Sequence, residues 1–160
     1  MYWRCNLLVL AGTVSWFTFF SHTTATPTAV GTLRFSSSSS ASHYDTLQIT
    51  LHNIPDPPAS HVYYAWLETP TNETDQPHWQ LNLQHGSVQM NALTYTGYAT
   101  LLIPHSLFLI TEEDSSQPPM VPFPALSAHR YYAEIPDATT TTLTVLTCPT
   151  DTSSMVCVAG

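Results

Sequence analysis

The sequence contains no lysine, and its positive charge is carried by three arginines, Arg4, Arg34 and Arg130. Acidic residues number 11, so the formal net charge is −8, and charged residues together make up only 9% of the chain. Proteins that bind a nucleic-acid backbone neutralise phosphates with lysine and arginine, and anionic lipid surfaces attract the same side chains. The composition therefore argues against nucleic acid as a partner and, beyond the N-terminus, against attraction to an anionic membrane.

Glycine is scarce as well, with 5 residues in 160, and no serine lies in a Gly-x-Ser-x-Gly turn. Such a turn exposes the nucleophile of many hydrolases beside their oxyanion hole. The acidic run Glu112-Glu113-Asp114 is a paired-carboxylate candidate for glycoside hydrolysis, but no second carboxylate group lies near it in the sequence. We interpret this run as a solvated turn that ends a strand, and we expect no catalytic residue and no enzymatic activity.

The eight histidines show no spacing that is typical of a metal site, such as His-x-x-x-His on a helix. A blue-copper site requires a cysteine, two histidines and usually a methionine on converging loops. Cys148 is followed by Met155 but by no later histidine, so this pattern fails. Surface positions on strands explain His52 and His78, and we expect neither a bound metal nor another cofactor.

Only three cysteines are present, Cys5, Cys148 and Cys157. Cys5 lies in the apolar N-terminal segment, which leaves Cys148 and Cys157 as a candidate disulfide pair near the C-terminus. In an oxidising compartment this pair would close a small loop, but two separate thiols are equally compatible with the spacing.

The N-terminus carries an apolar run from Leu7 to Phe20, with Arg4 before it and small polar residues after it. This order is typical of a secretory signal peptide. An uncleaved membrane anchor is the alternative, because aromatic residues at both ends of the run favour the membrane interfaces. We assign residues 1–29 to an apolar helix that is either a signal peptide or a membrane anchor. The rest of the chain is then extracytoplasmic, either secreted or attached to the membrane only through this segment.

Residues 30–44 include five consecutive serines and are expected to form a flexible serine-rich linker. The predicted folded domain spans residues 45–138. Residues 139–160 are expected to contribute one final strand, Leu143 to Leu146, followed by a loose tail.

Within the folded domain, apolar and polar residues alternate with a period of two, and no segment of useful length shows helical periodicity. The alternation holds over 47–51 and 79–83, and a turn at 85–87 separates the latter from the run 88–90. Further runs of this kind span 98–103, 106–113, 129–135 and 143–146. Seven or eight short strands with turns between them predict an all-β fold, an antiparallel β-sandwich.

The run from Val62 to Leu67 follows a loop that three prolines stiffen. Val62 and Trp66 belong to one face of the predicted strand and Tyr63 and Leu67 to the other, so both faces are apolar. A ligand-binding aromatic strip is one interpretation, but large aromatic side chains are core residues far more often than exposed platforms. We therefore predict a central strand whose second face is partly covered.

Four segments, in this order, resemble the extracytoplasmic domain of anti-sigma-K-type anti-sigma factors. IPDPPASHVYYAWLE (54–68) is similar to that family's LPPPPxGxxYxxWL stretch, and HWQLNLQHGSVQM (78–90) to its strand, glycine turn and strand. SLFLITEED (106–114), with the QPP that follows, is similar to FxVTxEPxGGSxxP, and HRYYAEIP (129–136) to the closing strand. The sequence TEED replaces the family's Glu-Pro-Gly-Gly turn, so the loop that follows is expected to differ.

The resemblance implies a β-sandwich outside the membrane that receives or transmits a signal through a protein partner at the cell envelope. In complete members, a cytoplasmic domain that sequesters a sigma factor precedes the membrane segment. Here only a handful of residues precede the apolar run, so we expect the sigma-binding domain to be absent and the chain to be either a stand-alone extracytoplasmic relative or a fragment. The expected function is that of a non-enzymatic regulatory or sensory module in the control of transcription.

Two other functions stay open at this point. A cell-surface module that binds carbohydrate or protein would use exposed aromatic residues such as Tyr63, Trp79 or Tyr132. A small copper-handling protein built on histidine and methionine is the third hypothesis.

Overall fold

The computed structural model describes residues 26–40, 43–69, 76–116, 119–122 and 125–149. Its elements are β1 (Ala29–Ser36), β2 (Thr46–His52), β3 (His61–Glu68), β4 (His78–Gln80), β5 (Leu83–Gln84), β6 (Ser87–Leu93), β7 (Leu107–Asp114), the 3₁₀ helix η1 (Leu126–Ala128), β8 (His129–Glu134) and β9 (Thr142–Thr147). Most of the predicted N-terminal helix falls on residues 1–25, outside the described ranges. Within those ranges no helix has the length and apolar character needed to cross a membrane.

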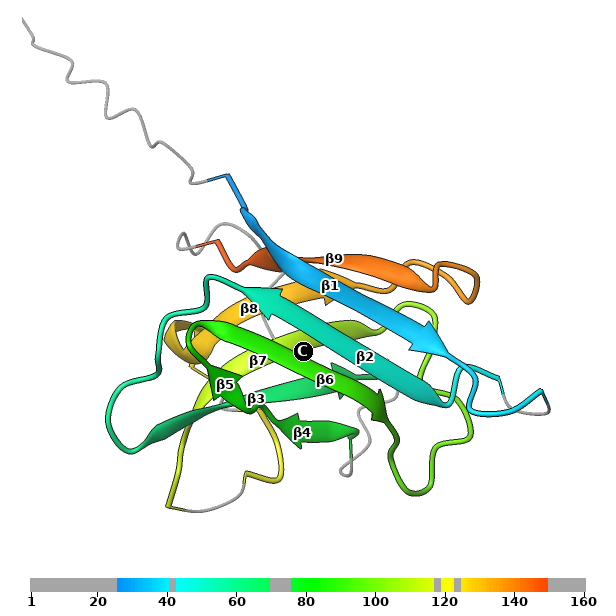
Figure 1. Ribbon diagram of the computed structural model, residues 1–160, viewed down its shortest axis with the longest axis horizontal. Helices are drawn as coiled ribbons and strands as arrows, with labels where there is room; N and C mark the ends of the chain where they lie inside the picture. The colour runs from blue at the N-terminus through cyan, green and yellow to red at the C-terminus, as the bar shows by residue number, and fades with distance from the viewer. Residues whose placement is uncertain (1–25, 41–42, 70–75, 117–118, 123–124, 150–160) are drawn as a thin grey trace, which may run out of the picture.

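The nine strands form one sheet, in the order β4-β3-β7-β8-β9-β1-β2-β6-β5, and every neighbouring pair is antiparallel (Figure 1). The prediction of an all-β, antiparallel fold is therefore confirmed. The predicted sandwich has two separate sheets, whereas the described strands belong to a single sheet. Strand β9 joins two groups of four strands, and it pairs with β1 over five residue pairs but with β8 over only two.

The two ends of this sheet approach each other because β4 and β5 are joined by only Leu81 and Asn82. A connection of this length spans at most about 11 Å, so the sheet must curl until its first and last strands are close. The backbone N–H of Leu81 donates to the carbonyl of Tyr63 at 2.9 Å, which extends the pairing of this segment with β3. The single strand predicted over 79–83 is thus divided between opposite edges of the sheet.

Strand β1 lies in residues that the sequence led us to assign to the linker. It pairs with both β2 and β9, and its side chains Leu33 and Phe35 are buried in the core. The linker prediction for residues 30–44 is therefore wrong up to residue 36, because alternating apolar residues precede the serine run and form an inward face. Both β1 and β9 lie outside the predicted domain limits of 45–138, yet they belong to the same sheet.

The apolar run 98–103 is not a strand, contrary to our prediction. Leu101 and Leu102 are buried, but the segment joins the rest of the molecule through a bond from the Leu101 N–H to the carbonyl of Tyr44 at 2.8 Å. The N–H of Ile103 donates to the carbonyl of Leu101 at 3.1 Å, which forms a tight local turn. The apolar residues here fill the core from a loop, and periodicity alone does not distinguish that role from a strand.

The predicted hairpin turn between β5 and β6 is confirmed. His85 and Gly86 form a two-residue connection with φ values of 51° and 74°. Positive φ at both central residues is typical of the turn that matches the twist of paired strands, and glycine adopts it without strain. The predicted strand over 143–146 is likewise present, as β9.

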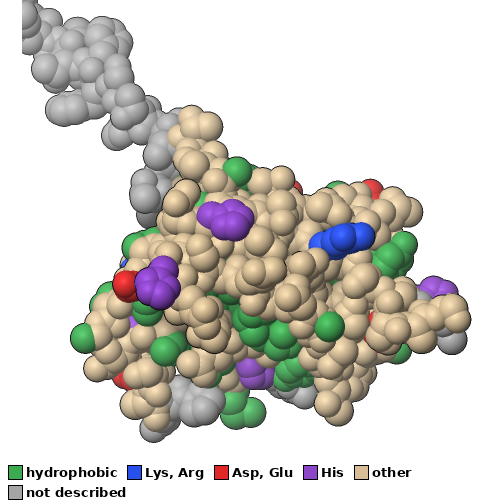
Figure 2. Space-filling view, viewed as in Figure 1, with side chains coloured by type: hydrophobic (Ala, Val, Ile, Leu, Met, Phe, Trp, Pro, Cys, Tyr) green, Lys and Arg blue, Asp and Glu red, His purple; other side chains and the backbone are tan. Residues whose placement is uncertain are grey.

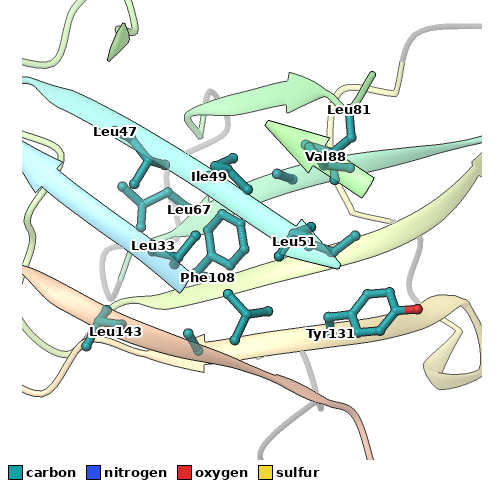
Figure 3. Packing of buried hydrophobic residues seen from close by; sticks show 14 of the residues in the cluster. Leu33, Leu47, Ile49, Leu51, Leu67, Leu81, Val88, Phe108, Tyr131 and Leu143 are labelled. Carbon is teal, nitrogen blue, oxygen red and sulfur yellow. The ribbon is translucent and has the colours of Figure 1, made fainter. Parts of the chain in front are cut away.

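The core lies between the two facing parts of the curled sheet (Figure 3). Leu33, Leu47 and Ile49 from β1 and β2 point toward Leu67 and Phe108 from β3 and β7. All of these side chains are almost completely removed from solvent, which is where large aliphatic and aromatic groups contribute most to stability.

Strand β3 buries both of its faces, as its sequence predicts. Tyr63 and Leu67 belong to the main core, whereas Tyr64 and Trp66 belong to a second cluster on the opposite face, with Leu109 and Tyr132. Pairing with β4 on one side and β7 on the other makes β3 an interior strand. Core packing, and not an exposed aromatic strip, is therefore the role of this segment.

Candidate functional site

Two adjoining surface hollows lie where β7 ends, β8 begins and the proline-containing loop 53–60 passes into β3. Their volumes are about 520 and 350 Å³. The larger is lined by His61, Glu112, Glu113, Asp114, Ser127, Ala128 and Arg130, and the smaller by Pro55, Asp56, Pro58, Tyr63, Glu112, Arg130, Tyr131 and Thr147. Glu112 and Arg130 line both hollows, so they mark the boundary between them. We call the two hollows together the Glu112–Arg130 groove.

A β-bulge positions Arg130. In the pairing of β7 with β8, Ile110 lies opposite Tyr131 but Thr111 lies opposite His129, so Arg130 is an extra residue in β8. Bulges bend the strand and redirect a side chain, and they are frequent beside functional sites. Here the bulge brings the arginine next to Glu112 of the neighbouring strand.

Arg130 and Glu112 form a close ion pair. Nε and Nη2 of Arg130 donate to the same carboxylate oxygen, Oε2 of Glu112, at 3.0 and 2.6 Å. The arginine side chain is 42% exposed and the glutamate only 11%. An ion pair of this exposure contributes little to folding, typically about 0 to 1 kcal/mol. Its main effect is to fix a positive and a negative group side by side in the groove.

Two tyrosines form the inner wall of the smaller hollow. The rings of Tyr63 and Tyr131 meet edge to face, with centroids 6.4 Å apart and an interplanar angle of 77°. Burial raises the pKa of Tyr63 to about 12, and the nearby Tyr131 and Glu112 add to this increase. Burial also raises the pKa of Tyr131. Both phenols therefore stay neutral at physiological pH and can donate hydrogen bonds.

The three consecutive carboxylates of β7 have three different environments. Glu112 faces Arg130, whereas Glu113 is only 5% exposed, and its Oε1 accepts a hydrogen bond from the hydroxyl of Thr111. Asp114 is exposed at the strand end, and the backbone N–H of Ser116 lowers its pKa by donating to Oδ1 at 2.8 Å. The interpretation of this run as a solvated turn is wrong for the two glutamates, because strand residues alternate between faces.

The aromatic residues expected at a carbohydrate-binding surface are less accessible than that hypothesis requires. Tyr63 and Tyr132 are only 3% and 8% exposed, so the prediction that they are exposed platforms is wrong. Each lies on an interior strand whose faces are both covered. Trp79 is half-buried, and its Nε1 donates to the carbonyl of Thr94 at 3.2 Å.

Half-buried rings instead gather around β4 and the loop that follows β6. The ring of Tyr95 lies 5.4 Å from His78, 6.0 Å from Trp79 and 5.9 Å from Tyr98. The imidazole of His78 also lies 5.0 Å from the buried indole of Trp66. Hydrophobic side chains are grouped near the centre of the face seen in Figure 2, in a surface that is otherwise largely polar and uncharged.

The histidines do not converge on a metal site in the described part of the chain. No group of three or more histidine, cysteine, aspartate or glutamate side chains there could hold a metal ion. His52 is exposed at the end of β2, as predicted, but His78 is half-buried among aromatic rings. His129 is buried on the sheet, and the sequence carries no signal that separates it from the surface histidines.

Cys148, which immediately follows β9, is disulfide-bonded. The described residues contain no other cysteine, so its partner lies outside them. Cys157, the partner that we expect, is among the residues that the structure does not describe.

The groove was not predicted from the sequence. Asp56, Tyr63, Glu112 and Arg130 are separated by up to 74 positions and meet only through the pairing of β3, β7 and β8. The sequence offers Glu112 as a candidate catalytic carboxylate, but it identifies its partner Arg130 only as one of three cations. No family model, curated protein or solved structure matches this chain.

Proposed function

We propose that this chain is a non-enzymatic, extracytoplasmic regulatory or sensory module that acts through protein contacts at the cell envelope. In this proposal it corresponds to the outer, sandwich-like domain of an anti-sigma-K-type factor and takes part in the control of transcription. The resemblance covers the outer domain alone, so binding of a sigma factor is not part of the proposal.

The observation that carries this proposal is that the four family-like segments follow one another along the chain over the elements from β3 to β8. The first segment includes β3, the second spans β4 to part of β6, the third is β7, and the fourth is β8. Three of these strands, β3, β7 and β8, are direct neighbours in the sheet.

The disulfide at Cys148 supports the proposed location. Disulfides form and persist in oxidising compartments and are rare in the cytosol of most organisms. With no lysine and only three arginines, the chain has little positive charge with which to attract a nucleic acid or an anionic lipid surface. Contacts with another protein are therefore the mode of action in this proposal.

Deletion of the gene in the organism that encodes it tests the proposal. We expect the transcripts of one sigma-factor regulon to change when the envelope is stressed, and a plasmid copy of the gene to restore them. A plasmid copy with Trp66→Ala, which removes a fully buried side chain, serves as the destabilised control and should restore them less well than the parent copy. Unchanged transcripts under all envelope stresses would rule out the regulatory role.

A cell-surface module that binds carbohydrate is the second candidate, favoured by the half-buried rings of Trp79, Tyr95 and Tyr98. Aromatic side chains that combine an apolar body with a polar tip are common at binding surfaces. A glycan array probed with the purified protein distinguishes the two functions. Binding that is lost in Tyr95→Ala but kept in Tyr44→Ala would favour the carbohydrate module.

A further inference from the structure

The Glu112–Arg130 groove has the size and the rigidity of a binding site. Its two hollows, of about 520 and 350 Å³, each fall in the range of about 300 to 1,000 Å³ that ligand sites occupy. Pro55 and Pro58 form part of the rim, and proline fixes the backbone of the loop that carries it. A rim that is ordered in advance reduces the conformational entropy lost on binding.

Negative charge dominates the lining of this groove. Asp56, Glu112 and Asp114 supply three carboxylates, whereas Arg130 supplies the one permanent positive charge of the lining. The whole chain adds to this imbalance with a net charge of −8 and no lysine. A partner whose potential is complementary to this surface must bring positive charge.

Arg130 itself shows how a cation is held in this position. Both of its bonds to Glu112 end on Oε2, although a side-by-side arginine–carboxylate pair uses both oxygens. Among the described residues, neither Oε1 of Glu112 nor Nη1 of Arg130 has a hydrogen-bond partner. The carboxylate therefore retains an acceptor for a second cation beside the first.

We propose that the Glu112–Arg130 groove binds a basic segment of a protein partner. An arginine or lysine side chain of that segment donates to Glu112, beside Arg130 or in its place, and Asp56 supplies a second carboxylate from the rim. Tyr63 is 3% exposed and forms part of the inner wall of the smaller hollow behind these carboxylates. The inference rests on the proposed function, because it names the surface and the charge of the partner that the module would contact.

The test is a titration of the purified full chain with the peptide Gly-Arg-Gly-Arg-Gly, blocked at both ends, at low ionic strength. We expect saturable binding by calorimetry, and no binding of the matched peptide Gly-Glu-Gly-Glu-Gly. Glu112→Gln and Asp56→Asn should each raise Kd by about fivefold, the effect of roughly 1 kcal/mol of lost charge interaction. Glu134→Gln removes the same charge at the opposite end of β8 and should change Kd by less than about twofold.

Arg130→Gln gives the sharpest result, because the proposal requires it to strengthen binding of the arginine peptide. Removing the resident cation frees Oε2 of Glu112 in addition to Oε1 and makes the groove more negative. Weaker binding in Arg130→Gln, or equal effects of Glu112→Gln and Glu134→Gln, would overturn the proposal. Asp56 is exposed in its loop, so Asp56→Asn keeps the test valid even if the ion-pair variants unfold.

The outcome of this titration does not depend on whether the module is regulatory, so the two proposals can fail separately. If the peptide binds as expected and gene deletion leaves all transcripts unchanged, the groove is a cation-binding surface of a module with another function. If the transcripts respond to deletion and Glu112→Gln leaves peptide binding unchanged, the module is regulatory but contacts its partner elsewhere.

Discussion

Trp66 is completely buried although it points away from the main core. Its Nε1 donates to the hydroxyl of Thr111 at 2.8 Å, and that hydroxyl donates in turn to the carboxylate of Glu113. The indole thus combines a large buried area with a satisfied polar group, which is how tryptophan is usually accommodated in protein interiors. The alternation of residues in β3 predicts the burial of Trp66, but not its polar partners, which come from another strand.

Truncation of this side chain should be strongly destabilising. We expect Trp66→Ala to lower the free energy of unfolding by about 3 to 5 kcal/mol, because it leaves a large cavity and removes the donor to Thr111. Urea unfolding followed by circular dichroism measures the loss. Trp79→Ala, at a half-buried indole, is the matched control and should lose clearly less; equal losses would contradict the assignment of Trp66 to the interior.

Asp137 makes the stability of the loop between β8 and β9 depend on pH. Its Oδ1 accepts hydrogen bonds from the hydroxyl and N–H of Thr139, both at 2.7 Å, and from the N–H of Thr140 at 2.8 Å. These bonds favour the ionised carboxylate and lower its pKa from 3.8 to about 2. Because the pKa is lower in the folded state, the stabilisation is complete above about pH 4 and disappears as the pH falls toward 2.

Asp137→Asn should remove this part of the acid dependence. We expect the free energies of unfolding of parent and variant, measured in urea at intervals between pH 6 and 2, to differ most at the upper end and to converge as the pH approaches 2. Curves that run parallel over the whole range would show that the carboxylate of Asp137 makes no such contribution.

At the scale of elements, β1 and β2 approach each other closely at Gly31. A Cβ atom added to Gly31 would lie 2.1 Å from the carbonyl oxygen of Thr50 and 2.8 Å from the Cα of Leu51. Both are backbone atoms of the paired strand, so the strands themselves would have to separate. Glycine here permits the close approach of two backbones, a role that it often has inside a strand.

Gly31→Ala should therefore destabilise the sheet by about 3 kcal/mol or more, at the upper end of the range for overpacked sites. Gly97→Ala is the matched control, because no atom lies within 4 Å of the added Cβ, although φ is +93° there. We expect a loss of about 1 to 2 kcal/mol for the control, the penalty for a left-handed conformation. Chemical denaturation gives both values, and a milder effect at Gly31 than at Gly97 would contradict the packing of β1 on β2.

Alternation in the sequence predicted most strands because it reports which residues face the core. It located β2, β3, β6, β7, β8 and β9 to within a few residues. It missed β1, because the short apolar pattern there contains a glycine and runs directly into the serines. It also predicted a strand over 98–103, where a loop supplies core residues. The division of 79–83 between β4 and β5 depends on the curl of the whole sheet, which no local pattern encodes.

At the scale of the whole molecule, the candidate groove depends on registers between strands that are distant in the sequence. Glu112 lies opposite Tyr63, and the bulge at Arg130 sets the second side of the ion pair. Composition could predict that the surface is acidic and poor in charge, but only tertiary pairing determines where the carboxylates meet the guanidinium. The disulfide at Cys148 was one of two options left open by the spacing of the cysteines.

Reduction of that disulfide should lower the stability of the whole domain, because Cys148 directly follows β9. We expect a loss of about 2 to 4 kcal/mol in Cys148→Ala or in reducing buffer, since a cross-link restricts the unfolded chain. Intact mass before and after reduction and alkylation checks the bond, and peptide mapping tests Cys157 as the partner. A reduced protein that unfolds at the same urea concentration would contradict the structural role.

Strand β9 has a consequence for the order of events during folding. Without it, β4-β3-β7-β8 and β1-β2-β6-β5 share no backbone pairing, since β9 alone connects β8 to β1. A ribosome makes β9 after all the other described strands, so the nascent chain cannot complete this sheet until β9 has emerged. Closure then waits for contacts of high sequence separation, which form slowly. Until β9 joins them, β1 and β8 would each expose an unpaired strand edge.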